Sequence, residues 1–274
     1  MLKKIYFTFY FLLTAFLVNS QVVINEYSAS NFDSHPDNYG EYEDWVELYN
    51  TTNSDIDLNG WSLTDKPSNL SKWSFPGSFI VSANSVAIVY CSGLNELVGG
   101  VAHTNFKITQ TKPGEVFVLS DAGGNIIDSA RAVPAQKSHS RGRDVNGGTT
   151  WSVFTTATPN TNNSGAMLEY APLPIFSQSS GYYSAPFDLT LSCADPNALL
   201  YYTTDGSRPD NSSNLYTGPF NISSTSVVKA VAYSTNSLVP PSFIDYHTFF
   251  INDTHTVPIL SVSGDSVAVL IEDG

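Results

Sequence analysis

The run Val86-Ala87-Ile88-Val89-Tyr90, followed by Cys91 and Ser92, indicates the class of fold more clearly than any other stretch. It is short, rich in β-branched residues and apolar on both faces, as expected for a central strand buried inside a sandwich. Similar short runs recur in both directions along the chain, and no long stretch keeps the helical period of 3.6 residues. The sequence therefore predicts an all-β protein.

The short runs form two series separated by turn residues, chiefly Gly, Pro, Asn, Asp and Ser. The first series is Val22 to Tyr27, Trp45 to Tyr49, Trp61 to Thr64, Lys72 to Phe75, Val86 to Cys91, Val116 to Ser120 and Ile126 to Ala130. The second is Phe187 to Cys193, Leu199 to Thr204, Val227 to Tyr233 and Tyr246 to Ile251. Within Phe187 to Cys193, the residues Leu189, Leu191 and Cys193 are predicted to share one face of a single strand.

A change in composition separates the two series. Around residues 157–174 the chain is rich in Thr, Pro, Asn and Ser and has little to bury, which is typical of a domain boundary. We predict one β-sandwich over residues 21–165, a linker over 166–172 and a second sandwich over 173–251. Residues 252–274 contain two further apolar runs without strand partners, and we expect them to begin a third region that the chain does not complete.

Charge and cysteine content exclude several classes of partner and scaffold. Acidic residues outnumber basic ones 25 to 12, giving a formal charge of -13, and such a surface repels the phosphates of nucleic acids. The two cysteines, Cys91 and Cys193, cannot form a disulfide scaffold or a four-cysteine zinc site. A bond between them needs Cα atoms within about 7 Å, and two free, buried thiols are the expected alternative.

The N-terminus has the features of an export signal. Lys3 and Lys4 precede an uncharged apolar run, Ile5 to Val18, which is too short to span a bilayer comfortably. We predict a signal peptide over residues 1–20 and a mature chain from Gln21, with an uncleaved membrane anchor as the alternative. No later segment is apolar enough to be an integral span, so the protein is expected to be secreted or displayed at the cell surface.

The first half carries the motifs of a known family. These are Val23 to Asn31, Asp44 to Asn50, Asp57 to Asp65 and Lys72 to Pro76, followed by Ser140 to Arg143, Trp151 and Thr158 to Asn160. Together they resemble bacterial lamin-tail domains over about residues 21 to 165. The resemblance implies an immunoglobulin-like sandwich without catalytic residues, used as an accessory module by exported bacterial enzymes and surface proteins.

The second half is similar to another family. Leu200 to Pro209, Leu215 to Pro219 and Val228 to Ala232 resemble the domain at the C-terminus of chitobiases and β-hexosaminidases. That module is also immunoglobulin-like and lies outside the glycosidase active site. The order of the two modules, followed by Val257 to Val262, resembles the front of exported proteins with a CotH-type kinase domain. The nucleotide and metal residues of such a kinase would lie beyond Gly274.

An acidic loop is the candidate metal site. Oxygen-bearing side chains are concentrated between Glu26 and Glu47, and carboxylates and amide oxygens are the ligands that Ca²⁺ prefers. The candidate ligands are Asp33, Asp37, Asp44 and Glu47. Their spacing matches no EF-hand, so a solvated acidic loop, or local capping and pairing by Asp44 and Glu47, is the competing interpretation. The chain's five histidines are too scattered to predict zinc.

Other possible sites have structural explanations. Asp205 and Asp210 could be taken for the carboxyl pair of a glycosidase, but Asp205-Gly206 and the nearby Pro209 are typical of turns. The four tryptophans, Trp45, Trp61, Trp73 and Trp151, could stack on sugars, but all lie beside predicted strands and are expected in the core. The tyrosines Tyr182, Tyr183, Tyr201, Tyr202 and Tyr216 would need to form one exposed patch to bind a ligand.

These observations lead to one expected function and two rivals. We expect an exported, non-enzymatic protein that binds a surface polysaccharide or protein through its sandwich modules, with no cofactor other than a possible Ca²⁺. A pure spacer without affinity for ligands is the first rival. The second is the N-terminal part of an exported enzyme, either a CotH-type kinase or a hydrolase, whose catalytic domain lies beyond residue 274.

Overall fold

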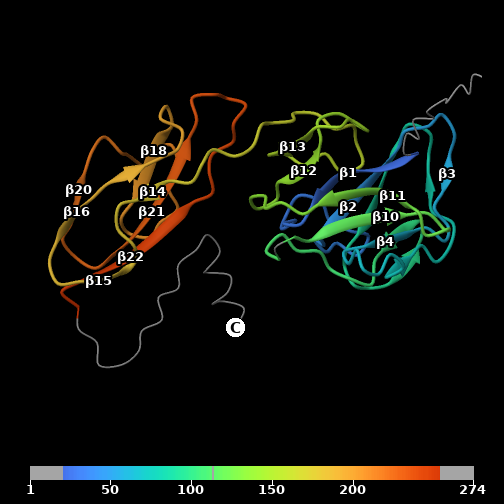
Figure 1. The fold of residues 1–274 in the computed structure, drawn as a ribbon, viewed down its shortest axis with the longest axis horizontal. Coiled ribbons are helices and arrows are strands. Elements are labelled where there is room, and N and C mark those ends of the chain that lie inside the picture. The colour runs from blue at the N-terminus through green and yellow to red at the C-terminus, as the bar shows by residue number, and fades with distance from the viewer. Residues whose placement is uncertain (1–20, 113, 254–274) are drawn as a thin grey trace, which may run out of the picture.

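The computed structural model describes residues 21–112 and 114–253, which form two β modules in sequence (Figure 1). We call residues 21–165 the first module and residues 173–253 the second. All regular elements in these residues are strands, so this part of the chain has no helix that could cross a membrane. The predicted all-β fold is confirmed. The predicted leader, 1–20, and nearly all of the predicted third region, 252–274, lie outside the described residues.

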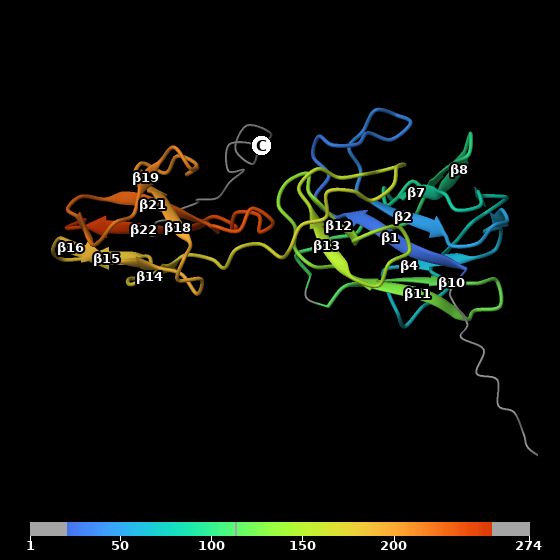
Figure 2. The same cartoon turned by 90° about the horizontal axis from the view of Figure 1, so that it is seen from above.

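The first module is a sandwich of a seven-stranded and a four-stranded sheet, which lie one above the other in Figure 2. The large sheet has the order β13-β12-β1-β2-β7-β9-β8, with β1 Val22–Ser28, β2 Trp45–Asn50, β7 Val86–Tyr90, β8 Glu96–Val98, β9 Val101–His103, β12 Ser140–Arg143 and β13 Trp151–Phe154. The small sheet has the order β11-β10-β4-β5, with β4 Ser62–Thr64, β5 Trp73–Ser74, β10 Val116–Ser120 and β11 Ile126–Arg131. A short pair, β3 Ile56–Asp57 and β6 Ile80–Val81, extends the module.

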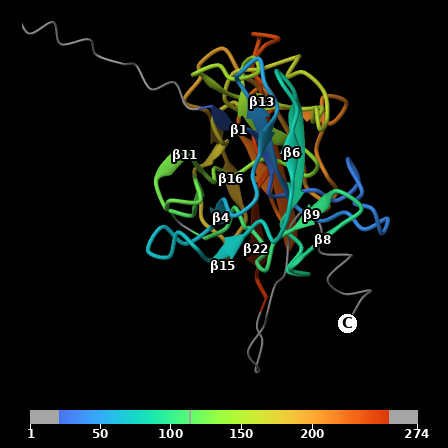
Figure 3. The ribbon, with the colours of Figure 1, turned by 90° about the vertical axis from the view of Figure 1, so that its right-hand side faces the viewer.

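The core of the first module lies between the two sheets. Alternate residues of the central strands point inward, among them Ile24, Leu48 and Val89 from the large sheet and Phe117 and Leu119 from the small one. All five are at least nine-tenths buried. In the end view, β4 and β11 of the small sheet lie on one side of the module and β8 and β9 of the large sheet lie on the other (Figure 3). The predicted two-sided burial of Val86–Tyr90 is seen on β7, where Val89 enters this core while Ile88 and Tyr90 pack on the opposite face.

The second module has a five-stranded sheet, β15-β22-β21-β18-β19, and two small two-stranded sheets, β14-β17 and β16-β20. The strands are β14 Ile175–Phe176, β15 Gly181–Tyr183, β16 Phe187–Leu189, β17 Leu191–Ser192, β18 Leu199–Thr203, β19 Asn214–Leu215, β20 Phe220–Ile222, β21 Ser226–Tyr233 and β22 Asp245–Ile251. Leu189, Ile222, Val228 and Phe249 pack together between the sheets. Both modules are immunoglobulin-like sandwiches.

The structure corrects one predicted strand and adds others. Phe187–Cys193 is two strands, because Thr190 interrupts it and β16 pairs with β20 while β17 pairs with β14. The predicted alternation persists across the break, with Leu189 and Leu191 buried and Thr190 exposed. β12 and β13 were not among the predicted strands, yet they complete the large sheet by pairing with β1 and with each other.

The linker, residues 166–172, is hydrogen-bonded to both modules, contrary to the expectation that it has little to bury. The backbone of Met167 pairs with Val153 on β13, at N–O distances of 2.8 and 3.2 Å. The Leu168 and Ala171 N–H groups donate to the carbonyls of Leu238 and Pro240 in the second module, at 2.8 and 2.9 Å. Figure 1 shows this segment running between the two modules.

Candidate functional site

The acidic loop between β1 and β2 is held in shape by Asn31. Its side-chain amide donates to the carbonyls of His35 and Glu43, at 2.7 and 2.8 Å. Its side-chain oxygen accepts from the N–H groups of Ser34 and His35 and from the Ser34 hydroxyl. One buried asparagine thus fixes both ends of the loop, because Asx side chains can replace the backbone as a hydrogen-bonding partner.

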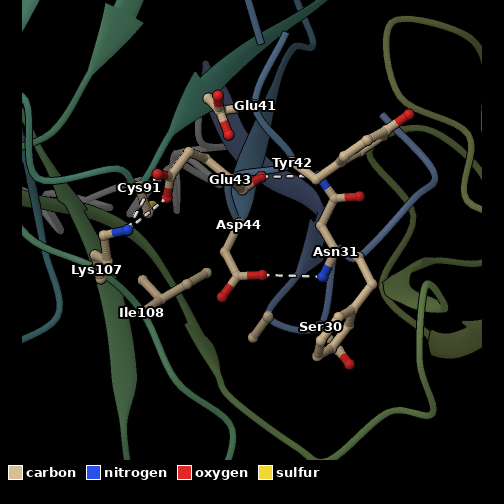
Figure 4. Close-up of a pocket in the computed structure, with 11 residues that line it drawn as sticks. Ser30, Asn31, Glu41, Tyr42, Glu43, Asp44, Cys91, Lys107 and Ile108 are labelled. Atoms are coloured by element: carbon tan, nitrogen blue, oxygen red, sulfur yellow. Dashed lines mark hydrogen bonds and ion pairs between the residues drawn. The ribbon is translucent and has the colours of Figure 1, made fainter. Parts of the chain in front are cut away.

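Beside Asn31 lies an open hollow of about 460 Å³ (Figure 4). It is lined by Ala29, Ser30, Asn31, Phe32, Glu41, Tyr42, Glu43, Asp44, Cys91, Lys107 and Ile108. The Asp44 carboxylate accepts the Asn31 N–H at 3.0 Å, and its other oxygen faces the space beside Ile108 in Figure 4. Burial raises the pKa of Asp44 to about 6, with a further contribution from the charge of Glu43. A carboxyl with such a pKa changes charge close to neutral pH.

The other polar groups of the hollow are paired or enclosed. The Lys107 ammonium lies 3.0 Å from both carboxylate oxygens of Glu43, and its charge also opposes the rise in the pKa of Asp44, whereas Glu41 is exposed. Cys91 lies fully buried at the base, and burial raises the pKa of its thiol far above the usual range. A buried, protonated thiol is a poor nucleophile, so Cys91 acts here as a small apolar residue.

The structure holds the four predicted calcium ligands in four different local settings. Asp33 is exposed, pairs with Lys137 at 3.5 Å and accepts the Ser138 hydroxyl. One oxygen of Asp37 accepts the N–H groups of its own turn, and the other is buried without a partner. Asp44 lies at the hollow, and Glu47 lies beneath a later segment of the chain. No group of three or more acidic, histidine or cysteine side chains within residues 21–112 and 114–253 is arranged to hold a metal ion.

Glu47 belongs to a buried network that the sequence motifs did not reveal. Glu26 on β1 and Glu47 on β2 are cross-strand neighbours, and both side chains are fully buried. A register shift at Asn25 places Asn25 and Glu26 in succession on the face away from the core, as a β-bulge does. Two adjacent polar residues inside the apolar run Val22–Tyr27 were the sequence signal for this bulge.

The donors for the two carboxylates come from distant segments. Glu26 accepts from the Ser140 hydroxyl at 2.5 Å and from the N–H and hydroxyl of Thr158 at 2.9 and 2.6 Å. Glu47 accepts from the Asn25 amide at 3.0 Å and the Asn160 N–H at 2.7 Å. Burial raises the pKa of Glu47 to about 8, and the nearby charge of Glu26 contributes to the rise. The network fastens residues 158–160 onto the outer face of the large sheet.

The turn aspartates and three of the four tryptophans have the structural roles that the sequence favoured, whereas Trp151 does not lie in the core as expected. Asp205 and Asp210 each accept the N–H of the residue two positions later, at 3.0 and 2.8 Å, which is the geometry of a turn. Trp45 and Trp73 are buried in the first module, and Trp61 packs against its core. Trp151 is 38% exposed but rests on Tyr27, with ring centroids 5.7 Å apart.

The tyrosines of the second module divide between its inside and its surface. Tyr202 stacks on Phe220 at 4.2 Å, and Tyr183 packs against Phe187 at 4.4 Å, both within the sandwich. Tyr182 is exposed and stacks on Phe250 at 4.7 Å. Cys193 is a half-buried free thiol, so neither cysteine of the described chain is in a disulfide.

The fold and these sites define a protein of two immunoglobulin-like modules, a kind of architecture that fits a binding or accessory role. Residues 18–133 match the family model of the Lamin Tail Domain, and residues 178–239 match that of the Chitobiase/beta-hexosaminidase C-terminal domain. The chain therefore contains one domain of each kind, and both resemblances noted in the sequence are confirmed. No curated protein matches the chain. The CotH-type resemblance stays a prediction, because neither model reaches residues 257–262.

Proposed function

We propose that this chain is a non-catalytic, exported spacer and binding unit, which holds its two modules in a set orientation and contacts a surface polysaccharide or protein. The observation that carries the proposal is the linker, whose backbone pairs with β13 on one side and with residues 238–240 on the other. A flexible tether would leave these groups to water. A hydrogen-bonded linker instead makes the pair of modules behave as one body.

The hollow beside Asn31 supports the binding part of the proposal. Phe32 on its rim is 55% exposed, with the Lys137 ammonium 5.4 Å from the centre of its ring, and Asp44 and Glu41 supply acceptors for hydroxyl or amine groups. Exposed aromatic faces next to hydrogen-bonding side chains suit sugar rings, which are apolar on their C–H faces and polar at their edges. The interior positions of Trp45 and Trp73 remove those two residues as a binding platform.

Binding is tested with isolated cell envelopes and purified surface polysaccharide as probes. We expect both to retain the chain, and we expect Phe32→Ser to weaken retention about tenfold, the effect of losing roughly 1.4 kcal/mol of contact. Leu94→Ser is the matched control, because Leu94 is 53% exposed in the same module but does not line the hollow. Equal retention of the two variants would show that the hollow is not the contact, and no retention of the wild type would remove the binding role.

The spacer part is tested independently by residual dipolar couplings, which report the orientation of each module in one alignment medium. We expect a single alignment tensor to fit both modules at neutral pH. Two different tensors would show that the modules reorient freely, and the spacer role would then be abandoned whatever the chain binds.

A further inference from the structure

The contact between the modules is centred on one tyrosine hydroxyl. The Tyr170 oxygen, on the linker, accepts the Gln136 N–H at 3.1 Å and lies 2.8 Å from Nδ1 of His139. The Gln136 side chain in turn donates to the carbonyls of Pro241 and Ser242 in the second module, at 2.8 and 3.1 Å. A chain of hydrogen bonds therefore runs from His139 through Tyr170 and Gln136 to the second module.

Ring contacts follow the same route. The His139 and Tyr170 rings are stacked, with centroids 5.9 Å apart and planes within 9° of parallel. The other neighbour of Tyr170 is Phe243 of the second module, whose ring meets it edge-on at 4.9 Å. Tyr170 is buried to more than nine-tenths, so a hydroxyl contact that it loses is costly to leave unmade, and its ring lies against Phe243 of the second module.

The hydrogen-bond pattern specifies the protonation state of His139. The Tyr170 hydroxyl already accepts from Gln136, and burial raises the pKa of Tyr170 to about 12, so it keeps its proton at neutral pH. Among the described residues, Nδ1 of His139 is the acceptor within reach of that proton. Nδ1 must then be unprotonated, which places the ring hydrogen of neutral His139 on Nε2.

The charges around His139 oppose a second proton. Beyond the effect of burial, the positive charge of Arg208, in the second module, lowers the pKa of His139 from across the junction. Arg141 of β12 and Glu169 of the linker form an ion pair with each other at 2.8 Å. Lys137, on the same turn, is paired with Asp33. Burial, followed by the charge of Arg208, lowers the pKa of His139. A lowered histidine pKa means that stability is present at neutral pH and is lost as the pH falls through the folded-state value, below about 6.5.

We propose that His139, Tyr170 and Gln136 form a pH-sensitive joint, in which protonation of His139 removes the acceptor of the Tyr170 hydroxyl proton and loosens the contact between the two modules. A protonated Nδ1 no longer accepts the Tyr170 hydroxyl proton, so that hydroxyl must turn and leave its own proton without a partner among the described residues. The added positive charge would also face Arg208. This inference rests on the proposed spacer role and adds a condition under which the spacer loosens.

The test compares residual dipolar couplings of the full chain at about pH 7.5 and about pH 5, on either side of a normal histidine pKa. We expect one alignment tensor for both modules at the higher pH and two at the lower. One tensor at both values would overturn the joint and leave the spacer role intact. Two tensors at both values would overturn the joint and the spacer role together.

Two variants and one direct measurement distinguish loss of the hydrogen bond between His139 and Tyr170 from other effects of low pH on the protein. His139→Gln keeps an acceptor but cannot be protonated, so we expect one tensor at both pH values. Tyr170→Phe keeps the ring but loses the hydroxyl, so we expect two tensors at both. The chemical shifts of the His139 ring nitrogens report which nitrogen carries the proton, and they can be measured in the wild-type chain. A proton on Nδ1 at about pH 7.5 would refute the proposed bond.

Discussion

The buried pair of Glu26 and Glu47 makes the stability of the first module depend on pH in an unusual direction. The pKa of Glu47 rises from an ordinary 4.5 to about 8 on folding, because the side chain is fully buried and lies beside Glu26. At pH values between these two pKa values, Glu47 keeps its proton in the folded module and has released it in the unfolded chain. The contribution of Glu47 to stability is therefore largest in acid and falls as the pH rises through this window, the reverse of what a paired surface carboxylate gives.

The size of the effect follows from the difference between the two pKa values. Each unit corresponds to about 1.4 kcal/mol, so Glu47 alone makes the unfolding free energy fall by up to about 1.4 kcal/mol per pH unit. Over the whole window the loss is on the order of 4 to 5 kcal/mol, comparable to the entire stability of many domains. Glu47→Gln removes the titrating group and is expected to flatten this slope. At low pH it should cost about 1 to 3 kcal/mol, because its amide faces an N–H donor.

Tryptophan fluorescence during urea unfolding is the assay, because all four tryptophans lie in the first module and report its unfolding separately from the second. Unfolding free energies are compared for the wild type, Glu47→Gln and the exposed control Glu41→Gln, at pH values from about 5 to about 9. We expect parallel slopes for the wild type and the control, and a shallower one for Glu47→Gln. Identical slopes for all three proteins would refute the argument.

Three further outcomes are expected. Phe117→Ala opens a cavity in the first module and should cost about 3 to 5 kcal/mol in the same urea assay. Gly142→Ala places a Cβ 3.0 Å from Asn163 Nδ2 and Glu26 Cγ and should cost about 1 to 3 kcal/mol, whereas Gly77→Ala meets Leu97 at an ordinary 3.7 Å and should be near neutral. Calorimetry with Ca²⁺ should show no saturable heat, because no three or more acidic, histidine or cysteine side chains of residues 21–112 and 114–253 are grouped to hold a metal ion, whereas a saturable heat abolished by Asp44→Asn would support the calcium hypothesis.

The local pattern of the sequence was sufficient to predict the class of fold and most of the long strands. Val116–Ser120 appears at its predicted bounds, and Trp45–Asn50 differs by one residue. Such runs are predictable because their burial follows from their own composition. The break at Thr190 was not predictable in this way, because the alternation of side chains continues through it and only the partners change.

β12 shows the limit of that reasoning. Ser140-Arg141-Gly142-Arg143 has the polarity of an exposed segment, yet all four residues are buried in the large sheet. Arg141 reaches Glu169 in the linker, and Arg143 reaches Asp128 on β11, both at 2.8 Å. A strand whose burial depends on such distant partners carries no local signal, because the partners that make it possible belong to other elements.

The sequence predicted only part of the candidate site, because the hydrogen-bonding partners of its acids also come from distant segments. The acidic loop is a real feature, and the hollow beside Asp44 lies against it, but neighbours in sequence do not share an environment there. Glu47 was grouped with Asp44 by proximity along the chain, whereas in space its donors come from Asn25 and Asn160. Sequence spacing can suggest which oxygens are available. It cannot show which of them are already occupied by backbone N–H groups from elsewhere in the chain.

The same network determines how far the first folding unit must extend. The matched Lamin Tail Domain region ends at residue 133, but Glu26 and Glu47 lie within it and take their donors from Ser140, Thr158 and Asn160, beyond its end. Without those donors the bulged strand would carry two buried carboxyl groups with most of their partners missing, at a cost of several kcal/mol. The segment that follows the match is therefore part of the fold, and the smallest unit able to bury its own acids runs from β1 through at least Asn160.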